Sequence, residues 1–125
     1  MKRARVIAEH RAPDRPSIQV APGDAVTLGE RDSDWPQFVW TTLTGGLGGW
    51  IPFDLFDRTH GDATAQHDYD TRELDADPGE MLVLHREMAD WWWAEKTQAT
   101  DTQGNSGWIP ARVLQIIDDD GIEEN

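Results

Sequence analysis

The residues of this 125-residue sequence best suited to chemistry are its histidines and carboxylates, because it contains no cysteine. Disulfides, zinc ribbons and thiol nucleophiles are therefore excluded. The four histidines are His10, His60, His67 and His85. Their spacing is not that of metal ligands, although His67 together with Asp68 and Asp70 could hold an ion weakly. We expect no metal and no cofactor.

Two further patterns are typical of enzymes but lack the context that catalysis needs. Asp75 and Asp77 could act as an acid and a base, yet loop carboxylates are usually only solvated. The glycine-rich run 45–49 has no lysine, no Ser/Thr and no following helix, so it is more typical of a hairpin turn than of a phosphate-binding loop. No Ser-His-Asp order has a supporting context. The sequence predicts a protein that is not an enzyme.

Charge is the next guide to a partner. The formal net charge is −13. Residues 1–60 hold seven basic and eight acidic side chains, a net charge of −1, whereas residues 61–125 hold four and sixteen, a net charge of −12. Such a surface repels nucleic acid and anionic lipid and attracts basic partners, or it serves only solubility. We expect residues 118–125, with Asp118–Asp120 and Glu123–Glu124, to form a solvated acidic tail.

The location of the protein is suggested by two negative features. The first ten residues are basic and lack the apolar stretch of a secretory signal. No segment is long and apolar enough to span a membrane. We expect a soluble, cytoplasmic protein with neither a membrane nor a nucleic acid as partner.

The elements that position these side chains recur with a period of about 56 residues. Four landmarks keep their order: Ala8-Glu9-His10 recurs as Ala65-Gln66-His67, Pro22-Gly23-Asp24 as Pro78-Gly79-Glu80, Val26 and Leu28 as Leu82 and Leu84, and Gly49–Pro52 as Gly107–Pro110. The repeat predicts one domain at 1–58, a linker at 59–62 and a second domain at 63–117.

Each half shows short strands separated by turns, and neither sustains helical periodicity. The expected strands are 5–8, 26–28, 38–42 and a strand ending at 50–51, then 81–86, 91–97 and 107–109, with a long turn at 98–105. Within 91–97, Trp91 and Trp93 should share one face of the sheet and Trp92 the other. The predicted fold class is all-β, as two tandem small five-stranded barrels or orthogonal sandwiches.

These motifs resemble those of the Src homology 3 (SH3) family, most closely the variant forms found as tandem pairs in small bacterial proteins. Residues Ala65-Gln66-His67-Asp68-Tyr69 stand where the family has Ala-Leu-Tyr-Asp-Tyr, Asp90–Ala94 where it has Asp-Trp-Trp-Leu-Ala, and Gly107–Leu114 where it has Gly-Tyr-Ile-Pro-Ser-Asn-Tyr-Val. The resemblance covers 5–57 and 63–117, and it implies two SH3-like barrels.

The resemblance also implies a groove for an extended, often proline-rich ligand, floored by aromatic side chains and flanked by an acidic loop. In the second barrel the implied groove residues are Tyr69, Trp91 and Pro110, with His67 at the first tyrosine position, and Glu73, Asp75 and Asp77 for a basic ligand residue. The pattern departs from the family where Val113 replaces a tyrosine. The loop from Tyr69 to Leu74 is also short for the family.

The first barrel retains less of this groove. The resemblance puts His10 and Ala12 at its tyrosine positions and Leu55 at the late one. Asp34-Trp35 matches Asp90-Trp91 by sequence, but the spacing to the Gly-Trp-Ile-Pro landmark favours Phe38 as the counterpart of Trp91. Trp35 or Phe38, together with Pro52, could therefore lie at a groove.

Three functions follow from these observations. The leading one is a non-catalytic interaction module whose second barrel binds an extended basic peptide that can contain proline. An alternative is a structural tandem unit with vestigial grooves. Binding of cell-wall peptides is a third, which the absence of an export signal disfavours.

Overall fold

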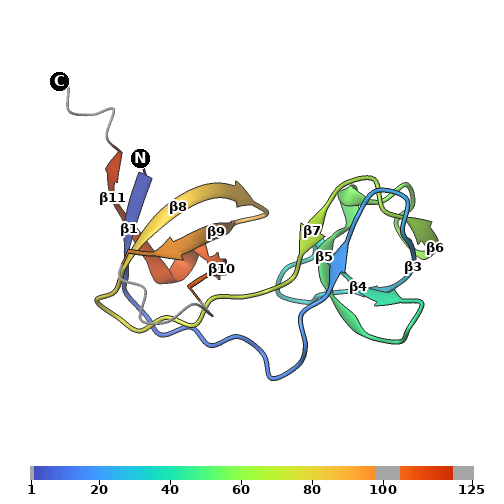
Figure 1. Cartoon of the computed structure of the whole chain (residues 1–125), viewed down its shortest axis with the longest axis horizontal. Coiled ribbons are helices and arrows are strands. Elements are labelled where there is room, and N and C mark those ends of the chain that lie inside the picture. The colour runs from blue at the N-terminus through green and yellow to red at the C-terminus, as the bar shows by residue number, and fades with distance from the viewer. Residues whose placement is uncertain (1, 98–104, 120–125) are drawn as a thin grey trace. The chain divides into compact units, whose positions relative to one another are not determined.

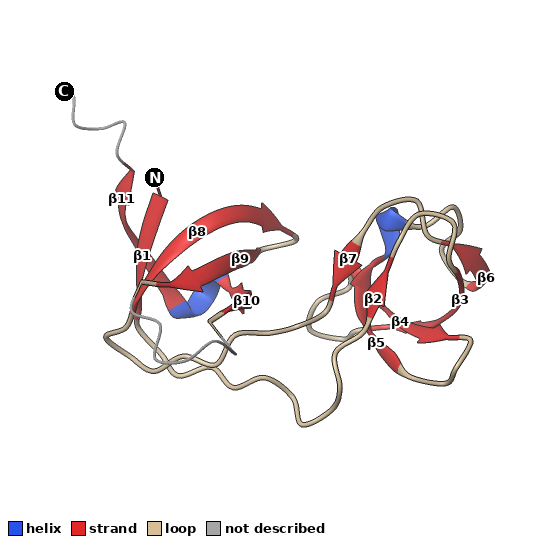
Figure 2. Ribbon diagram, in the orientation of Figure 1, coloured by secondary structure: helices blue, strands red, loops and turns tan. Residues whose placement is uncertain are grey.

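The computed structural model describes residues 2–97 and 105–119, and these form β-strands and short 3-10 helices (Figure 1, Figure 2). The strands are β1 (Lys2–Val6), β2 (Gln19–Val20), β3 (Ala25–Arg31), β4 (Phe38–Leu43), β5 (Gly48–Pro52), β6 (Gly61–Thr64), β7 (Tyr69–Asp70), β8 (Met81–Met88), β9 (Trp91–Lys96), β10 (Ser106–Pro110) and β11 (Leu114–Asp119). The 3-10 helices are η1 (Phe53–Leu55) and η2 (Ala111–Val113). The all-β class is confirmed. Within the described ranges, no helix has the length and apolar character needed to cross a membrane.

The strands form two compact units that are not the two halves of the sequence. Unit 1 contains Met1–Asp14 and Arg72–Asn125, and unit 2 contains Arg15–Thr71. The chain therefore crosses between the units twice, after residue 14 and after residue 71. These boundaries differ from the contiguous domains and the linker that the repeat predicts, because the two repeats exchange their first strands.

Unit 1 is built on a five-stranded antiparallel sheet in the order β10-β9-β8-β1-β11. The N-terminal strand β1 lies between two strands of the second repeat, as Figure 1 shows, and Ala4 is opposite both Leu82 of β8 and Ile116 of β11. Ala4 and Val6 are buried whereas the intervening Arg5 is exposed. This alternation fixes the face that β1 presents to the core.

Unit 2 is built on a four-stranded antiparallel sheet in the order β5-β4-β3-β6, with β2 and β7 as a separate pair. β6 comes from the second repeat and lies against β3, with Ala63 opposite Val26. It holds on β3 the place that β1 holds on β8. Since β6 begins at Gly61, the predicted linker at 59–62 is partly strand.

Backbone hydrogen bonds identify the equivalent residues of the exchanged segments. The amide N–H of Val6 donates to the carbonyl O of Glu80, and Gly79 N–H donates to the carbonyl O of Val6. In unit 2 the same two bonds join Ala65 to the preceding Pro-Gly-Asp turn. Val6 is therefore the counterpart of Ala65, and the sequence alignment that pairs Ala8 with Ala65 is wrong by two residues.

The same strand register shows which residue of the second repeat is equivalent to His10. His10 is bridged to Ala76, three residues before Gly79, and Tyr69 pairs with Val20, three residues before the equivalent glycine. His10 is therefore the counterpart of Tyr69 and not of His67.

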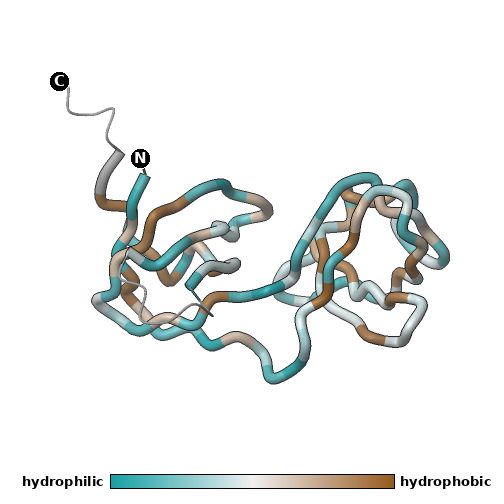
Figure 3. Tube along the Cα trace, in the orientation of Figure 1, coloured by the Kyte–Doolittle hydropathy of each residue, from teal (hydrophilic) through white to brown (hydrophobic). Residues whose placement is uncertain are grey.

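Each unit has its own apolar core, and apolar residues lie along the strands of both in Figure 3. The core of unit 1 comprises Ala4, Val6, Leu74, Ala76, Leu82, Leu84, Ala94, Ile109, Val113 and Leu114. Trp92 packs against this core. Trp93 forms an edge-to-face pair with Trp108 on the other face of β9, which agrees with the predicted alternation.

An arginine stacks on a tryptophan pair directly after each crossing. Arg72 lies 5.4 Å from the ring centroid of Trp93, whose own centroid is 5.4 Å from that of Trp108. The corresponding residues of unit 2 are Arg15, Trp40 and Trp50. Through these cation–π contacts, the segment that follows each crossing packs at the equivalent position on the sheet of its unit.

The crossing segment after residue 71 lies close to β10 because β10 contains a glycine. A Cβ at Gly107 would come within 2.9 Å of the carbonyl carbon of Glu73. Next to it, Trp108 N–H donates to the carbonyl O of Arg72 over 2.9 Å. The glycine of the Gly-Trp-Ile-Pro landmark therefore serves close backbone approach.

The predicted acidic tail begins later than expected. β11 extends to Asp119, with Asp118 opposite Arg3 and Asp119 opposite Lys2. Residues 118 and 119 therefore belong to a strand. Residues 120–125 of the tail, and residues 98–104 of the predicted long turn, lie outside the described residues.

Candidate functional site

Trp91 is the half-buried aromatic residue at the start of β9 in unit 1. It follows a two-residue turn in which Ala89 and Asp90 have φ angles of 53° and 70°. Positive φ at both central residues is the geometry of the tightest hairpin turns, and it is costly for a residue with a Cβ. Across the strand pair Trp91 is opposite Pro110. The indole is thus fixed at the end of a tight hairpin.

His10 contacts Trp91 from the exchanged N-terminal segment. The two ring centroids are 5.6 Å apart and the planes make an angle of 78°, an edge-to-face arrangement. The Nε2 of His10 lies 2.9 Å from Oε1 of Glu73, and the two side chains are only 15% and 19% exposed. The imidazole is therefore held against the indole by a carboxylate as well as by its backbone bridge to Ala76.

The three carboxylates that the sequence assigns to a basic ligand residue all lie in unit 1, and all have partners in residues 10–12. Glu73 contacts His10, as described. Asp75 accepts a hydrogen bond from the backbone N–H of Ala12 over 2.7 Å, and Asp77 accepts one from the Arg11 guanidinium. The pKa of Arg11 is raised, chiefly by this hydrogen bond with Asp77. We call residues 73–77 the acidic loop.

The structure separates the other residues assigned to the groove. Tyr69 lies in unit 2, where it is 5% exposed, and it does not share a unit with Trp91. His67 is an exposed residue of the same segment. Pro110 is in unit 1 beside Trp91 but is fully buried, so it supports the strand end and leaves no surface for a ligand.

In unit 2 the ambiguity between Trp35 and Phe38 is resolved by strand register. Phe38 is opposite Pro52, as Trp91 is opposite Pro110, so Phe38 is the counterpart of Trp91. Phe38 is only 6% exposed and Pro52 is fully buried. Trp35 is half-buried in the loop before β4. Phe38, Tyr69 and Pro52 are therefore all buried residues of unit 2.

Sequence reasoning missed His10 and Arg11 as residues of the site in unit 1. Both belong to the first repeat, and a contiguous domain would have placed them with Phe38. One signal was available in the sequence, because the loop from Tyr69 to Leu74 is short. The chain runs from unit 2 into unit 1 at this point.

The exchange also redistributes charge. Unit 1 holds eight basic and fifteen acidic residues, a net charge of −7, and unit 2 holds three and nine, a net charge of −6. The concentration of acid in residues 61–125 is therefore not the property of one folded unit. What distinguishes the site in unit 1 is the local grouping of Glu73, Asp75 and Asp77 near Trp91, and not the charge of the whole unit.

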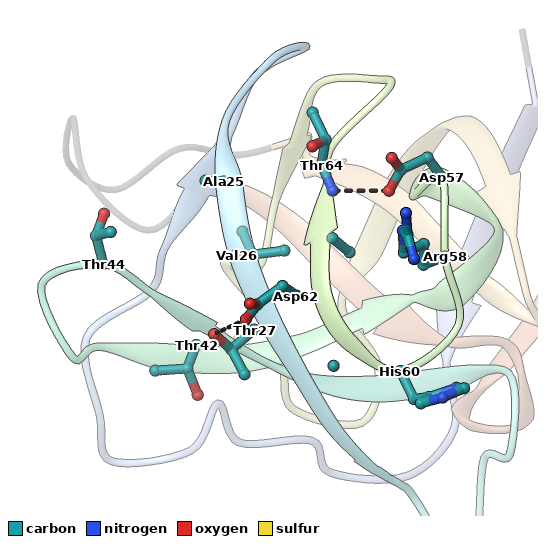
Figure 4. A pocket seen from close by; sticks show the side chains of 12 residues that line it. Ala25, Val26, Thr27, Thr42, Thr44, Asp57, Arg58, His60, Asp62 and Thr64 are labelled. Carbon is teal, nitrogen blue, oxygen red and sulfur yellow. Dashed lines mark hydrogen bonds between the residues drawn. The ribbon is translucent and has the colours of Figure 1, made fainter.

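Unit 2 has an open pocket of about 760 Å³ at β3 and β6, shown in Figure 4. Its charged lining residues are Asp57, Arg58, His60 and Asp62. Asp57 accepts a hydrogen bond from the backbone N–H of Thr64 over 2.8 Å. None of the residues that the sequence assigns to a site lines this pocket. In the part of the chain that is described, no group of three or more His, Asp or Glu side chains is arranged to hold a metal ion.

Comparison with known proteins gives no match: no family model, no curated protein and no solved structure is similar to this chain.

Proposed function

We propose that both units are SH3-like barrels that have exchanged their first strands. Two features support this proposal. In each unit three consecutive strands form a meander, β3-β4-β5 or β8-β9-β10, whose last strand carries Gly-Trp-Ile-Pro. A 3-10 helix, η1 or η2, follows that motif directly in both units.

The proposed function is non-catalytic binding of an extended peptide by unit 1, with Trp91 as the platform. One observation carries the proposal: Trp91 is partly exposed at a position where unit 2 buries Phe38. An indole face offers a large rigid apolar surface to proline rings or aliphatic side chains, at little cost in entropy. Ligands in the polyproline II conformation are themselves already ordered.

The charges around Trp91 favour a basic ligand. The acidic loop lies next to His10, which contacts the indole, so a peptide that packs on Trp91 can present a lysine or arginine to Asp75 or Asp77. These carboxylates are exposed, and charge complementarity at such a rim contributes more to specificity and association rate than to affinity. Binding should therefore weaken as salt is added.

Calorimetric titration of the whole chain with basic proline-rich peptides tests this function. Trp91→Ala should weaken binding by about tenfold or more, as expected for a central aromatic residue. Trp35→Ala is the matched control, since it removes a half-buried indole from the corresponding region of unit 2. A loss of affinity in the Trp35 variant but not in the Trp91 variant would move the site to unit 2.

A structural role is the second candidate, and the burial of Phe38, Tyr69 and Pro52 favours it for unit 2. Such residues stabilise a core and present little surface to a ligand. Under this proposal unit 2 has a structural role, and unit 1 binds the peptide. Absence of binding to wild type at millimolar peptide would extend the structural role to the whole chain.

A further inference from the structure

We propose that Arg11 determines the specificity of unit 1 by occupying the acidic loop from within the chain. Its guanidinium takes the place that a basic ligand residue would otherwise take. This inference rests on the proposed peptide-binding function, and it concerns which peptides are selected.

The guanidinium of Arg11 makes four polar contacts. Nη2 lies 2.5 Å from Oδ1 of Asp77 and 3.0 Å from Oε2 of Glu9. Nη1 donates to the carbonyl oxygens of Ala76 and His10, each over 3.0 Å. A guanidinium with both terminal nitrogens engaged in this way matches the recognition expected for a ligand arginine.

The backbone on both sides of Arg11 is fixed to the same loop. His10 N–H donates to the carbonyl O of Ala76 over 3.0 Å, Ala76 N–H donates back to His10 over 2.9 Å, and Ala12 N–H donates to Asp75. Arg11 is therefore held next to the acidic loop by an ordered segment of its own chain. Its effective concentration there is high whether or not a ligand is present. A ligand arginine must displace it.

The position of Arg11 also couples it to the aromatic platform. His10, its neighbour in the chain, packs edge-to-face on Trp91 and contacts Glu73 at the start of the loop. An extended peptide that packs on the indole of Trp91 can therefore also reach the Arg11 guanidinium, or the carboxylates that this guanidinium covers.

The ion pair between Arg11 and the acidic loop is of modest strength. The Arg11 side chain is 48% exposed and that of Asp77 is 61% exposed, and ion pairs between exposed side chains are weak. In wild type an arginine of the peptide must displace Arg11, so it should improve affinity only a little. In a chain without Arg11 the same arginine should improve affinity several-fold. The acidic surroundings of Trp91 still favour a peptide of basic overall charge, but wild type should not select for one arginine placed opposite Asp77.

A cycle of two proteins and two peptides tests the proposal. The proteins are wild type and Arg11→Gln, and the peptides are a proline-rich sequence with one arginine and the same sequence with alanine in its place. We expect the arginine to improve the Kd of wild type by less than about twofold and that of the variant by about fivefold, the upper range for an exposed pair. Arg5→Gln, an exposed change of the same charge on β1, should behave as wild type.

A double variant tests whether the effect of the peptide arginine depends on the negative charge of Asp77. In Arg11→Gln/Asp77→Asn the arginine of the peptide should lose its advantage again. Equal dependence on the peptide arginine in wild type and Arg11→Gln, with both proteins binding, overturns the inference and leaves the proposed function standing. Failure of wild type to bind either peptide at millimolar concentration overturns the proposed function, and the inference with it.

Discussion

Units 1 and 2 use equivalent positions in opposite ways. Unit 1 places His10 against a partly exposed Trp91, whereas unit 2 places Tyr69 and Phe38, the counterparts of these residues, in its interior. Strand register at the two Gly-Trp-Ile-Pro motifs is the same. The difference shows that the same strand arrangement can present an aromatic side chain at the surface or bury it in the core, depending on the residue that starts the second strand of the meander.

The loops before these aromatic residues differ as well. Unit 1 has a two-residue turn with positive φ at Ala89 and Asp90, and unit 2 has the six residues 32–37. In unit 2, Phe38 N–H donates to the carbonyl O of Trp35 in that loop, over 2.8 Å. The short turn keeps the approach to Trp91 free of such a loop, so the two units are suited to different tasks.

The largest effect is expected from deletion of residues 1–14. Unit 1 loses β1 from the interior of its sheet, while every strand of unit 2 is retained. The side-chain NMR signals of Trp91 and Trp108 should lose their dispersion, and those of Trp40 and Trp50 should keep theirs. The reverse pattern is expected if each repeat folds on its own, and it would contradict the exchange.

A smaller effect distinguishes the two aromatic positions. Phe38→Ala removes a buried ring and should lower the free energy of unfolding of unit 2 by about 3–5 kcal/mol. Trp91→Ala should cost unit 1 about half as much, because its ring is already partly solvated. Urea unfolding followed by resolved tryptophan signals in each unit measures both. Equal losses would mean that Trp91 is a core residue and would remove the basis for a platform.

The smallest effect concerns the tight turn. Ala89 has a φ of 53°, a conformation that costs an L-residue about 1–2 kcal/mol and glycine nothing. Ala89→Gly should stabilise unit 1 by about 0.5 kcal/mol, since the greater entropy of glycine in the unfolded chain offsets part of the gain. Ala25→Gly, in the extended strand β3, should instead destabilise unit 2 by about 0.5–1 kcal/mol. Stabilisation by both changes would argue against strain at the turn.

The local elements could be predicted from the sequence, because strand alternation and turn residues act over a few neighbours. The hairpin at Gly45 and Gly46 and the opposite faces of Trp92 and Trp93 are examples. The partner of β1 could not be predicted in this way. Both repeats offer it a similar apolar edge, Val26 and Leu28 or Leu82 and Leu84, and periodicity does not distinguish them.

The residues that favour the exchanged arrangement become apparent only in the folded units. His10 has a carboxylate partner in Glu73, and Arg11 has one in Asp77. Each of these pairs joins the first repeat to the second. Exposure was equally hard to predict, since nothing in residue type indicates that Phe38 is buried while Trp91 is not.

Chemical-shift mapping on the labelled whole chain is the most direct test of the site in unit 1. On titration with a basic proline-rich peptide, we expect the indole N–H of Trp91 and the backbone amides of His10 and Glu73 to shift together, although they come from both repeats. The amides of Phe38 and Tyr69 in unit 2 should stay in place. Shifts centred on Phe38, Tyr69 or Trp35, or no shifts at millimolar peptide, would contradict a binding site assembled in unit 1.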